Sequence, residues 1–183
     1  MLHRYQAGDK AADFNYETPW EGPRTFYKST EGKITVLIFL RYLGCPVCRM
    51  EMAVLKAGIG LLEAKQATVF VVLQSSPSTV AAQTGKAAWP FEIVCDPAGD
   101  LFRLYRVEPG GFFRYLHPSG LIDVMQATFR GYRHGRFEGR ETQLPAVFVI
   151  GRDKHIQWAH YGKTIGDVPK PSAIADQIDA SCR

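Results

Sequence analysis

The sequence predicts an α/β fold with a central, mostly parallel sheet, one antiparallel strand near the end, and helices on its faces. Two observations predict it. The runs Val36–Leu40 and Val69–Leu73 are apolar at every position, which is typical of strands buried on both faces of a parallel sheet. Helical patterns alternate with these strands, as in βαβ units. A chain of 183 residues fits one domain, expected over residues 1–183.

The first expected elements lead from the N-terminal part of the chain into the sheet. Residues 13–17 and 24–27 flank a turn rich in Pro and Gly and are predicted to form two short strands. Residues 33–42 contain the first long apolar strand. Residues 45–65 then form a helix, because Pro46 suits a first helical position and apolar residues recur at spacings of three, four and seven.

Glycines interrupt that helix before the next strand begins. Gly58 and Gly60 weaken its distal part, so we expect a kink or an early end. Residues 68–74 form the following strand. A helix over residues 77–88 follows, with Ser76 as its cap.

The remaining elements surround an insertion. We expect a strand over 91–95, a helix over 100–107 and an inserted segment over about 108–140 that contains a helix near 121–132. The closing elements are a buried strand over 146–150, a strand over 155–161 and an amphipathic helix over 172–180.

Composition excludes several classes of protein. With 46% hydrophobic and 22% charged residues, the chain is neither disordered, nor collagen-like, nor a coiled coil. No apolar run approaches the roughly 18–20 residues that a membrane span needs. The first twenty residues lack the apolar core of a secretory signal, so we expect a cytoplasmic protein. Four cysteines are too few for a secreted disulfide scaffold.

The informative chemistry lies in the segment LIFLRYLGCPVCRMEMAVL. Cys45 follows a buried strand and precedes a helix, at the sheet edge where sites form. The free N–H groups and the dipole at a helix start stabilise a thiolate and lower a cysteine pKa from about 8.5 to roughly 3.5–7.5. Cys48 lies one turn further, within disulfide reach. The pattern predicts dithiol redox chemistry, with Arg41 and Arg49 as candidate sources of positive potential.

Other interpretations of these cysteines stay open: inert core residues, or half of a zinc site. Zinc needs four ligands, and Cys95, Cys182, His117 and His134 show no ligand-like spacing. We therefore expect no metal and no organic cofactor. Cys95 is expected in the core and Cys182 in a mobile end, with a resolving thiol as the alternative for each. His134 reaches the site only if the insertion folds back.

A proline stands directly before a late buried strand. In QLPAVFVIGRDKHIQWAHYG, Pro145 precedes the apolar run of residues 146–150. This arrangement resembles the thioredoxin superfamily, whose members carry a cis-proline there, beside the redox cysteines. The resemblance implies a cis Leu144–Pro145 bond and a substrate-binding role for Pro145. The alternative is an ordinary trans proline at the start of a strand.

Four segments narrow the resemblance. In chain order they are AGDKAADFNYET, LIFLRYLGCPVCRME, FEIVCDPAGDLFRLYRV and LPAVFVIGRDKHIQWAHYG. Together they resemble the alkyl hydroperoxide reductase / thiol-specific antioxidant (AhpC/TSA) family, and within it a peroxiredoxin-like branch with a C-x-x-C motif. The similarity spans about residues 7–165 and is weakest in the insertion. It implies a thioredoxin-like fold and a thiol-dependent oxidoreductase.

The chain departs from the peroxiredoxin motif P-x-x-x-T-x-x-C. Laid on that motif, Cys48 takes the peroxidatic position and Glu51 a commonly retained acidic position. Cys45 replaces the threonine and Arg41 replaces the proline. The family's peroxide-polarising arginine falls at Pro145, with no Arg to match it. Breaking an O–O bond needs such donors, whereas disulfide exchange needs only a low-pKa thiolate and a resolving thiol.

Two assignments of the cysteines follow. In the first, Cys45 is the nucleophile, at the exposed start of the helix, and Cys48 resolves. In the second, Cys48 attacks a peroxide and its sulfenic acid condenses with Cys45. Both end in a Cys45–Cys48 disulfide. We expect a thiol–disulfide oxidoreductase that acts on a hydroperoxide or a protein disulfide, with electrons from a thioredoxin-like protein or glutathione. The alternative is a disulfide reductase without peroxidase activity.

Residues 101–140 are basic and aromatic. They contain eight aromatic residues and seven arginines against three acidic residues, while the rest of the chain is neutral. The arginines are Arg103, Arg106, Arg114, Arg130, Arg133, Arg136 and Arg140. We favour a small helical cap, with the aromatic residues packed inward and the arginines solvated, over a homodimer or partner surface. Single-stranded nucleic acid is the least expected ligand. A non-catalytic interaction protein is the alternative class, and the intact C-x-x-C argues against it.

Overall fold

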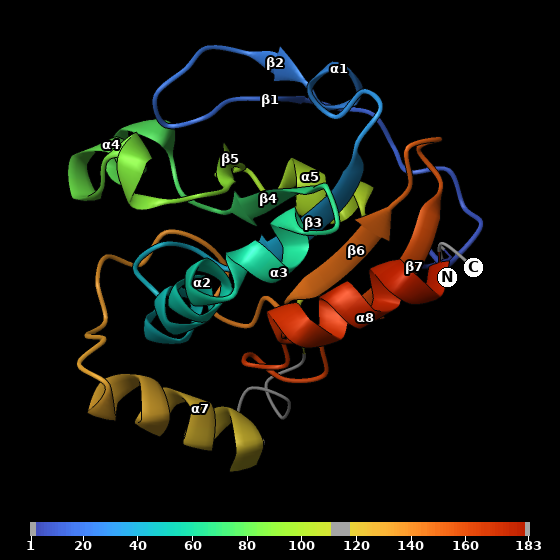
Figure 1. The fold of residues 1–183 in the computed structure, drawn as a ribbon. Helices are drawn as coiled ribbons and strands as arrows, with labels where there is room; N and C mark the ends of the chain where they lie inside the picture. The colour runs from blue at the N-terminus through green and yellow to red at the C-terminus, as the bar shows by residue number, and fades with distance from the viewer. Residues whose placement is uncertain (1–2, 111–117, 182–183) are drawn as a thin grey trace.

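The computed structural model describes residues 3–110 and 118–181 and contains one five-stranded sheet (Figure 1). Its strands are β3 (Ile34–Leu40), β4 (Ala67–Leu73), β5 (Glu92–Cys95), β6 (Ala146–Ile150) and β7 (Ile156–Tyr161). The order across the sheet is β5-β4-β3-β6-β7. The pairs β3–β4 and β4–β5 are parallel, and β6 is antiparallel to both of its neighbours. The predicted sheet with a single reversed strand is confirmed.

The sheet is central because its strands are apolar at nearly every position. All seven residues of β3 and all five of β6 are buried. Parallel pairing sets Leu40 beside Leu73, so β3 and β4 end together at one edge of the sheet. The chain segments that leave these two strands therefore meet, and the C-x-x-C follows β3 at this edge.

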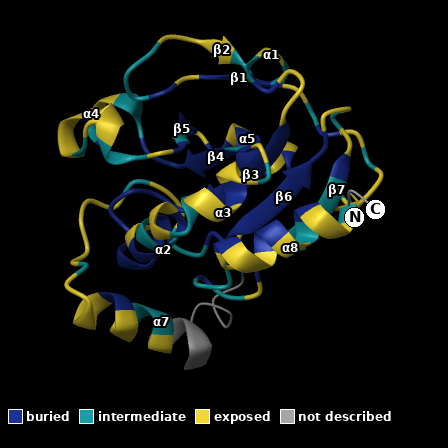
Figure 2. Ribbon diagram, in the orientation of Figure 1, coloured by how far each residue is buried: buried dark blue, intermediate teal, exposed yellow. Residues whose placement is uncertain are grey.

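Helices cover both faces. They are α1 (Phe26–Ser29), α2 (Pro46–Ala57), α3 (Ile59–Glu63), α4 (Pro77–Gln83), the 3-10 helix η1 (Lys86–Ala88), α5 (Asp100–Leu104), α7 (Pro118–Phe129) and α8 (Pro171–Ser181). The helices α2, α3 and α8 form one hydrophobic core with one side of β3. The other side packs with α1, α5 and the short strand β1 (Asn15–Tyr16), which pairs with β2 (Arg24–Thr25). Figure 2 shows the sheet buried between these layers.

The expected kink after α2 is confirmed. The helix ends at Gly58, and α3 begins at the next residue. A Cβ at Gly58 would lie 2.7 Å from the ring of Pro171, the first residue of α8. Glycine therefore lets α8 start directly against the corner between α2 and α3.

The insertion contributes α7 and the segment that returns to β6. The predicted inserted helix is confirmed, but it spans Pro118–Phe129 instead of residues 121–132. Tyr132 donates its N–H to the carbonyl of Ala127 in the turn that ends it. The expectations for Arg114, His117 and Cys182, and for the aromatic residues at 112, 113 and 115, fall outside the described residues. Within the described residues, every helix is too short or too polar to cross a bilayer.

Candidate active site

The start of α2 brings the two cysteines together. Cys45 is the N-cap residue of α2 and its sulfur accepts the backbone N–H of Cys48 at 3.3 Å. Pro46 fills the first helical position, where its missing N–H leaves no bond unmade. Both thiols are free in this structure. A cap of this kind gives Cys45 the positive end of the helix, as the motif predicts.

Cys45 is not exposed, contrary to the expectation from its place at the start of the helix. Its exposed fraction is 0%, and that of Cys48 is 2%. The segment that follows α7, residues 133–141, covers this end of the helix; we call it the covering loop. Sequence spacing cannot show this contact because the covering loop lies about 90 residues further along the chain.

Backbone packs on backbone where the covering loop meets the motif. The N–H of Gly135 donates to the carbonyl of Gly44 at 2.8 Å. A Cβ at Gly44 would lie 2.2 Å from the carbonyl oxygen of Arg136. Only a residue without a side chain permits this approach. Gly44 therefore allows the covering loop to seal the cysteines from solvent.

Arg41 connects the end of β3 to the Cys45 sulfur. Its side chain is 4% exposed, and its Nη2 donates to Cys45 Sγ at 2.8 Å. Arg49, the second arginine that the sequence offers as a source of positive potential, is exposed to solvent. Of the two, the structure places Arg41 on the sulfur.

The two thiols have opposite tendencies to ionise. The hydrogen bond from Cys48 lowers the pKa of Cys45 most; burial opposes it, and the Arg41 charge and the Cys48 N–H lower it further, to about 6. The pKa of Cys48 is raised, first by burial and then by its bond to Cys45 and the charge there. At neutral pH the pair therefore consists of a Cys45 thiolate and a Cys48 thiol.

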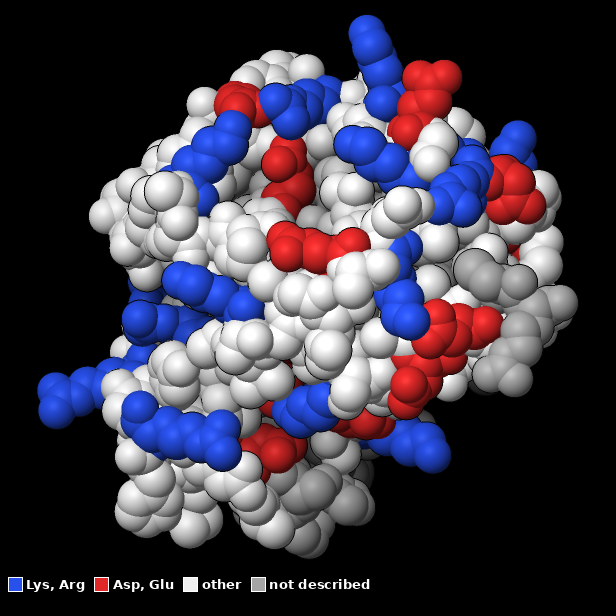
Figure 3. Space-filling view, in the orientation of Figure 1, with Lys and Arg blue, Asp and Glu red and all other residues white. Residues whose placement is uncertain are grey.

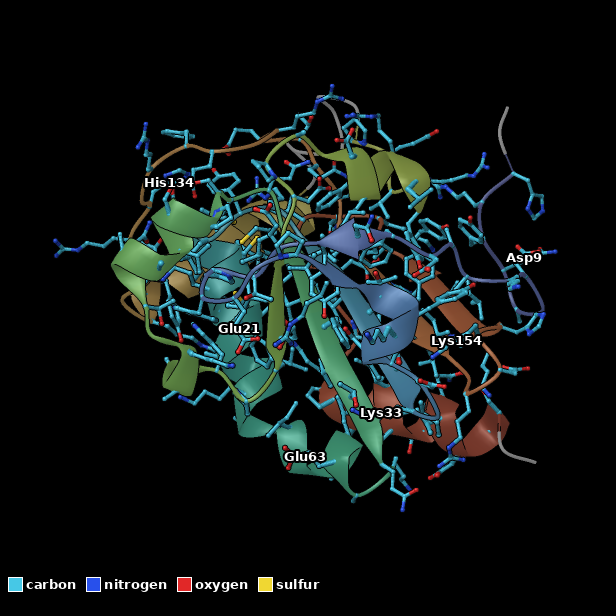
Figure 4. All side chains as sticks on the ribbon, turned by 90° about the horizontal axis from the view of Figure 1, so that it is seen from above. Asp9, Glu21, Lys33, Glu63, His134 and Lys154 are labelled. Carbon is cyan, nitrogen blue, oxygen red and sulfur yellow. The ribbon has the colours of Figure 1, made fainter. Side chains whose placement is uncertain are left out.

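A polar cluster from the covering loop holds Arg41. Glu141 accepts hydrogen bonds from Arg41 through its backbone carbonyl and its carboxylate. Its carboxylate also accepts a hydrogen bond from the hydroxyl of Tyr42. His134 Nε2 lies 3.1 Å from the Tyr42 hydroxyl. Figure 4 labels His134, at the left of its view. The insertion thus folds back, and His134 reaches the edge of the site, although it contacts Tyr42 in place of a sulfur.

Tyr42 and Glu141 are site residues that the sequence analysis does not identify. Tyr42 adjoins Arg41 in sequence, but nothing in its pattern separates it from a core tyrosine. Glu141 is 100 residues from Arg41, so no local spacing connects them. Ser75, after β4, adds a further contact by donating to Glu138 of the covering loop at 2.7 Å.

The expected cis bond at Pro145 is wrong. The described residues contain no cis peptide bond. Gln143 pairs with Pro109 in an isolated antiparallel bridge, so the chain is already extended before β6 and the ordinary trans form continues it. Pro145 is buried, its carbonyl accepts the N–H of Gly162 at 2.9 Å, and its ring lies against that glycine.

The remaining candidates are Cys95, which shares a hydrophobic core with Cys45 and Cys48, and Glu51, one turn after Cys48 on α2. Burial raises the pKa of Cys95, at the end of β5, to about 12. Glu51 is buried on α2 and pairs with Lys170 at 3.0 Å. Residues 3–110 and 118–181 contain no group of three or more His, Cys, Asp or Glu side chains that could hold a metal ion.

A C-x-x-C at the start of a helix, at the edge of such a sheet, is typical of thiol-dependent oxidoreductases with a thioredoxin-like fold, and the family match agrees. The AhpC/TSA family model matches residues 7–159. The chain belongs to that family. No curated protein matches the chain in a sequence search.

Solved structures confirm the fold. Peroxidoxin BcpB from Mycobacterium tuberculosis is similar at 15% identity and a TM-score of 0.64, covering 97% of this chain and 96% of its own. A peroxiredoxin-like protein from Aquifex aeolicus is similar at 15% identity and a TM-score of 0.68, with coverages of 98% and 89%. A putative thiol:disulfide interchange protein DsbE from Chlorobium tepidum is 22% identical, with a TM-score of 0.60 and coverages of 98% and 99%.

Proposed function

We propose that Cys45 is the nucleophile and Cys48 the resolving thiol of a thiol–disulfide exchange cycle. The observation that carries this assignment is the hydrogen bond from Arg41 Nη2 to Cys45 Sγ at 2.8 Å. A guanidinium at that distance stabilises a thiolate, and the thiolate is the reactive form of cysteine.

The cycle balances without a cofactor. The Cys45 thiolate attacks one sulfur of a substrate disulfide, forms a mixed disulfide and releases the first substrate thiolate. Cys48 then loses its proton and attacks Cys45 Sγ, which forms the Cys45–Cys48 disulfide and releases the second thiolate. Two electrons pass to the substrate, whose two sulfurs take up two protons. Reduced thioredoxin-like protein or glutathione returns the two electrons.

The negative charge on Cys45 suppresses the ionisation of Cys48 in the resting state, and the loss of that charge in the mixed disulfide removes this effect. The pKa of Cys48 is raised partly by the bond to Cys45 and by the charge there. Both disappear when Cys45 is bonded to substrate, whereas the lowering effect of Arg41 remains. Cys48 therefore becomes easier to ionise once it has a disulfide to resolve.

Substrate access requires the covering loop to move, since both sulfurs are buried. Pro145, which is buried, is a second proposed substrate contact. We place the cycle in the cytoplasm, where thiol reductants keep dithiols reduced. Residues 1–183 form one domain in this proposal.

Hydroperoxide reduction is a second candidate, and Arg41 favours it. This chain has Pro145 at the position of the family's peroxide-polarising arginine. Arg41 nevertheless supplies a cationic donor beside Cys45. The Cys45 thiolate would attack the O–O bond, giving a sulfenic acid and, with one proton, an alcohol. Condensation with the Cys48 thiol would then form the disulfide and release water.

Stopped-flow mixing separates these candidates. Reduced wild-type protein and the variants Cys45→Ser and Cys48→Ser are mixed with hydrogen peroxide or with a protein disulfide. We expect disulfide reduction by wild type and loss of the first step in Cys45→Ser. Failure of the wild type to reduce any disulfide would exclude the exchange cycle. Peroxide consumption lost in Cys48→Ser but kept in Cys45→Ser would move peroxide attack to Cys48.

A further inference from the structure

Along the covering loop and the end of α7, acidic side chains bond to the interior and basic side chains are exposed to solvent. The carboxylates of Glu138 and Glu141 turn inward, to Ser75 and to Arg41 with Tyr42. The arginines of this stretch are all exposed: Arg130, Arg133, Arg136 and Arg140. Figure 3 shows Lys and Arg side chains gathered over this part of the molecule, at the left of the view. The outer surface is therefore cationic, although the stretch contains acidic residues.

An apolar stripe adjoins this charge. Ile122, Met125 and Phe129 follow one another at spacings of three and four on α7, with exposed fractions of 52%, 57% and 85%. Phe137 of the covering loop is 67% exposed, and its ring lies tilted against that of His134, with centroids 4.1 Å apart. The expectation that the aromatic residues pack inward is therefore wrong for Phe129 and Phe137. Figure 2 shows α7 exposed over most of its described length. We call these four residues and the four arginines the 122–140 face.

The 122–140 face lies directly outside the dithiol. The covering loop carries Arg133, Arg136, Phe137 and Arg140, and its Gly135 bonds to Gly44, next to Cys45. A macromolecule that binds this face is therefore in contact with the segment that must move to uncover the sulfurs.

We propose that the 122–140 face docks an acidic protein that carries the dithiol reductant of this enzyme. The inference rests on the proposed exchange cycle and names the partner of its second half. A partner thiolate attacks the Cys45–Cys48 disulfide and forms a mixed disulfide, and the partner's second thiolate displaces it. The partner is oxidised to a disulfide, and Cys45 and Cys48 gain two electrons and one or two protons, depending on the ionisation of Cys45.

Charge and shape favour this occupant over two others. A second copy would bring the same four arginines opposite themselves in a two-fold contact, which like-charge repulsion opposes. A single-stranded nucleic acid would neutralise the arginines and could stack bases on Phe129 and Phe137, but it would leave the aliphatic side chains of Ile122 and Met125 without an apolar partner. An acidic protein with an apolar centre complements both parts of the face.

The test compares two reductants of the oxidised full chain. One is an acidic thioredoxin and the other is dithiothreitol, and the ratio of their reduction rates reports docking. The variants are Arg133→Gln/Arg136→Gln and Phe129→Ser. The matched controls are Arg152→Gln, beyond the opposite end of β6, and Leu61→Ser on α3, an exposed apolar residue.

We expect the rate ratio to fall about tenfold in the double arginine variant and with rising salt, because charges at the rim of an interface act mainly on association. We expect a threefold or larger fall in Phe129→Ser, and no fall in either control. A rate ratio that stays the same at high salt and in both variants would overturn the docking surface. So would a rate of reduction by thioredoxin no higher than the rate with equimolar glutathione.

Three other results are distinguishable. Self-association or oligonucleotide binding can also be measured in the double arginine variant. If either depends on Arg133 and Arg136 while the rate ratio does not, the face belongs to a second copy or to nucleic acid, and the proposal is overturned. If no Cys45–Cys48 disulfide forms, or dithiothreitol cannot reduce it, the exchange cycle itself fails.

Discussion

Next to the hydrogen bond from Cys48, the charge of Arg41 is the main influence that lowers the pKa of Cys45; it is buried beside that sulfur and also acts on Cys48. Burial raises the pKa of a cysteine, and it is the largest of the causes that raise the pKa of Cys95. The low pKa of Cys45 therefore requires specific partners, of which Arg41 is the one with a full charge.

Replacing Arg41 tests this role at the residue scale. We predict that Arg41→Gln raises the pKa of Cys45 by about 1 to 3, as expected for loss of an opposite charge in contact. The measurement is the pH dependence of thiolate absorbance at 240 nm, with a wild-type midpoint of about 6. Arg49→Gln is the matched control, since Arg49 is exposed. An unchanged midpoint in Arg41→Gln would show that the hydrogen bonds from Cys48 lower the pKa without help from the Arg41 charge.

The sequence predicts these residues to different degrees. The C-x-x-C and its place between strand and helix are local, so both cysteines and the low-pKa tendency are predictable. The choice of Arg41 over Arg49 depends on side-chain direction, which spacing does not give. Glu141 meets Arg41 only through a fold-back of 100 residues. The burial of Cys45 has the same distant origin.

At the scale of elements, the covering loop closes the site through contacts that a small change can break. It touches the motif backbone to backbone at Gly44, and it makes polar bonds to Ser75, Gln74, Tyr42 and Arg41. Loops held by few apolar contacts open at a low free-energy cost. We therefore expect the covering loop to limit access to the sulfurs.

A methyl group at Gly44 tests the closure. We predict that Gly44→Ala lowers the free energy of unfolding by about 1–3 kcal/mol and speeds alkylation of Cys45 several-fold at pH 8, where its thiolate fraction is constant. The reason is the 2.2 Å approach of the new Cβ to the Arg136 carbonyl oxygen.

Gly60→Ala is the control for that substitution. Gly60 has nothing within 4 Å of an added Cβ, and alanine in α3 adds up to about 1 kcal/mol of helix propensity. Urea unfolding and iodoacetamide kinetics measure both variants. Wild-type alkylation kinetics in Gly44→Ala would mean that the covering loop does not limit access.

Elements were predictable where periodicity is strong and where the chain supplies its own caps. The central strands, α2 and the break at Gly58 follow from apolar runs, Pro46 and glycine. The start of the inserted helix at Pro118 was missed because no apolar stripe in the sequence marks that position. The cis bond at Pro145 came from resemblance alone, and the extended pairing of Gln143 with Pro109 removes the need for it.

For the whole molecule, the Cys45 thiolate links ionisation to stability. Its pKa of about 6 in the folded protein lies below the value of about 8.5 expected in the unfolded chain. A lowered acid pKa contributes stability that is complete above the unfolded value and is lost as the pH falls through the folded value. The relevant window is therefore pH 6 to 8.5. Cys48, with a raised pKa, opposes this only above about 8.5.

We predict that the reduced protein gains about 2 kcal/mol of unfolding free energy between pH 5.5 and pH 8 relative to Cys45→Ser. Urea denaturation at the two pH values measures it, and the difference between the proteins removes the contribution of the histidines. Parallel pH dependence in both proteins would show that no stabilised thiolate exists at Cys45.

The most direct test of the nucleophile assignment is to map the first mixed disulfide that forms. Reduced Cys48→Ser and Cys45→Ser are mixed with a small aromatic disulfide at pH 6.5, quenched with acid within seconds, and digested for mass spectrometry. We predict a rapid adduct on Cys45 in the first variant and none on Cys48 in the second. A rapid adduct on Cys48 in Cys45→Ser, with Cys45 slow in the other variant, would contradict the central claim.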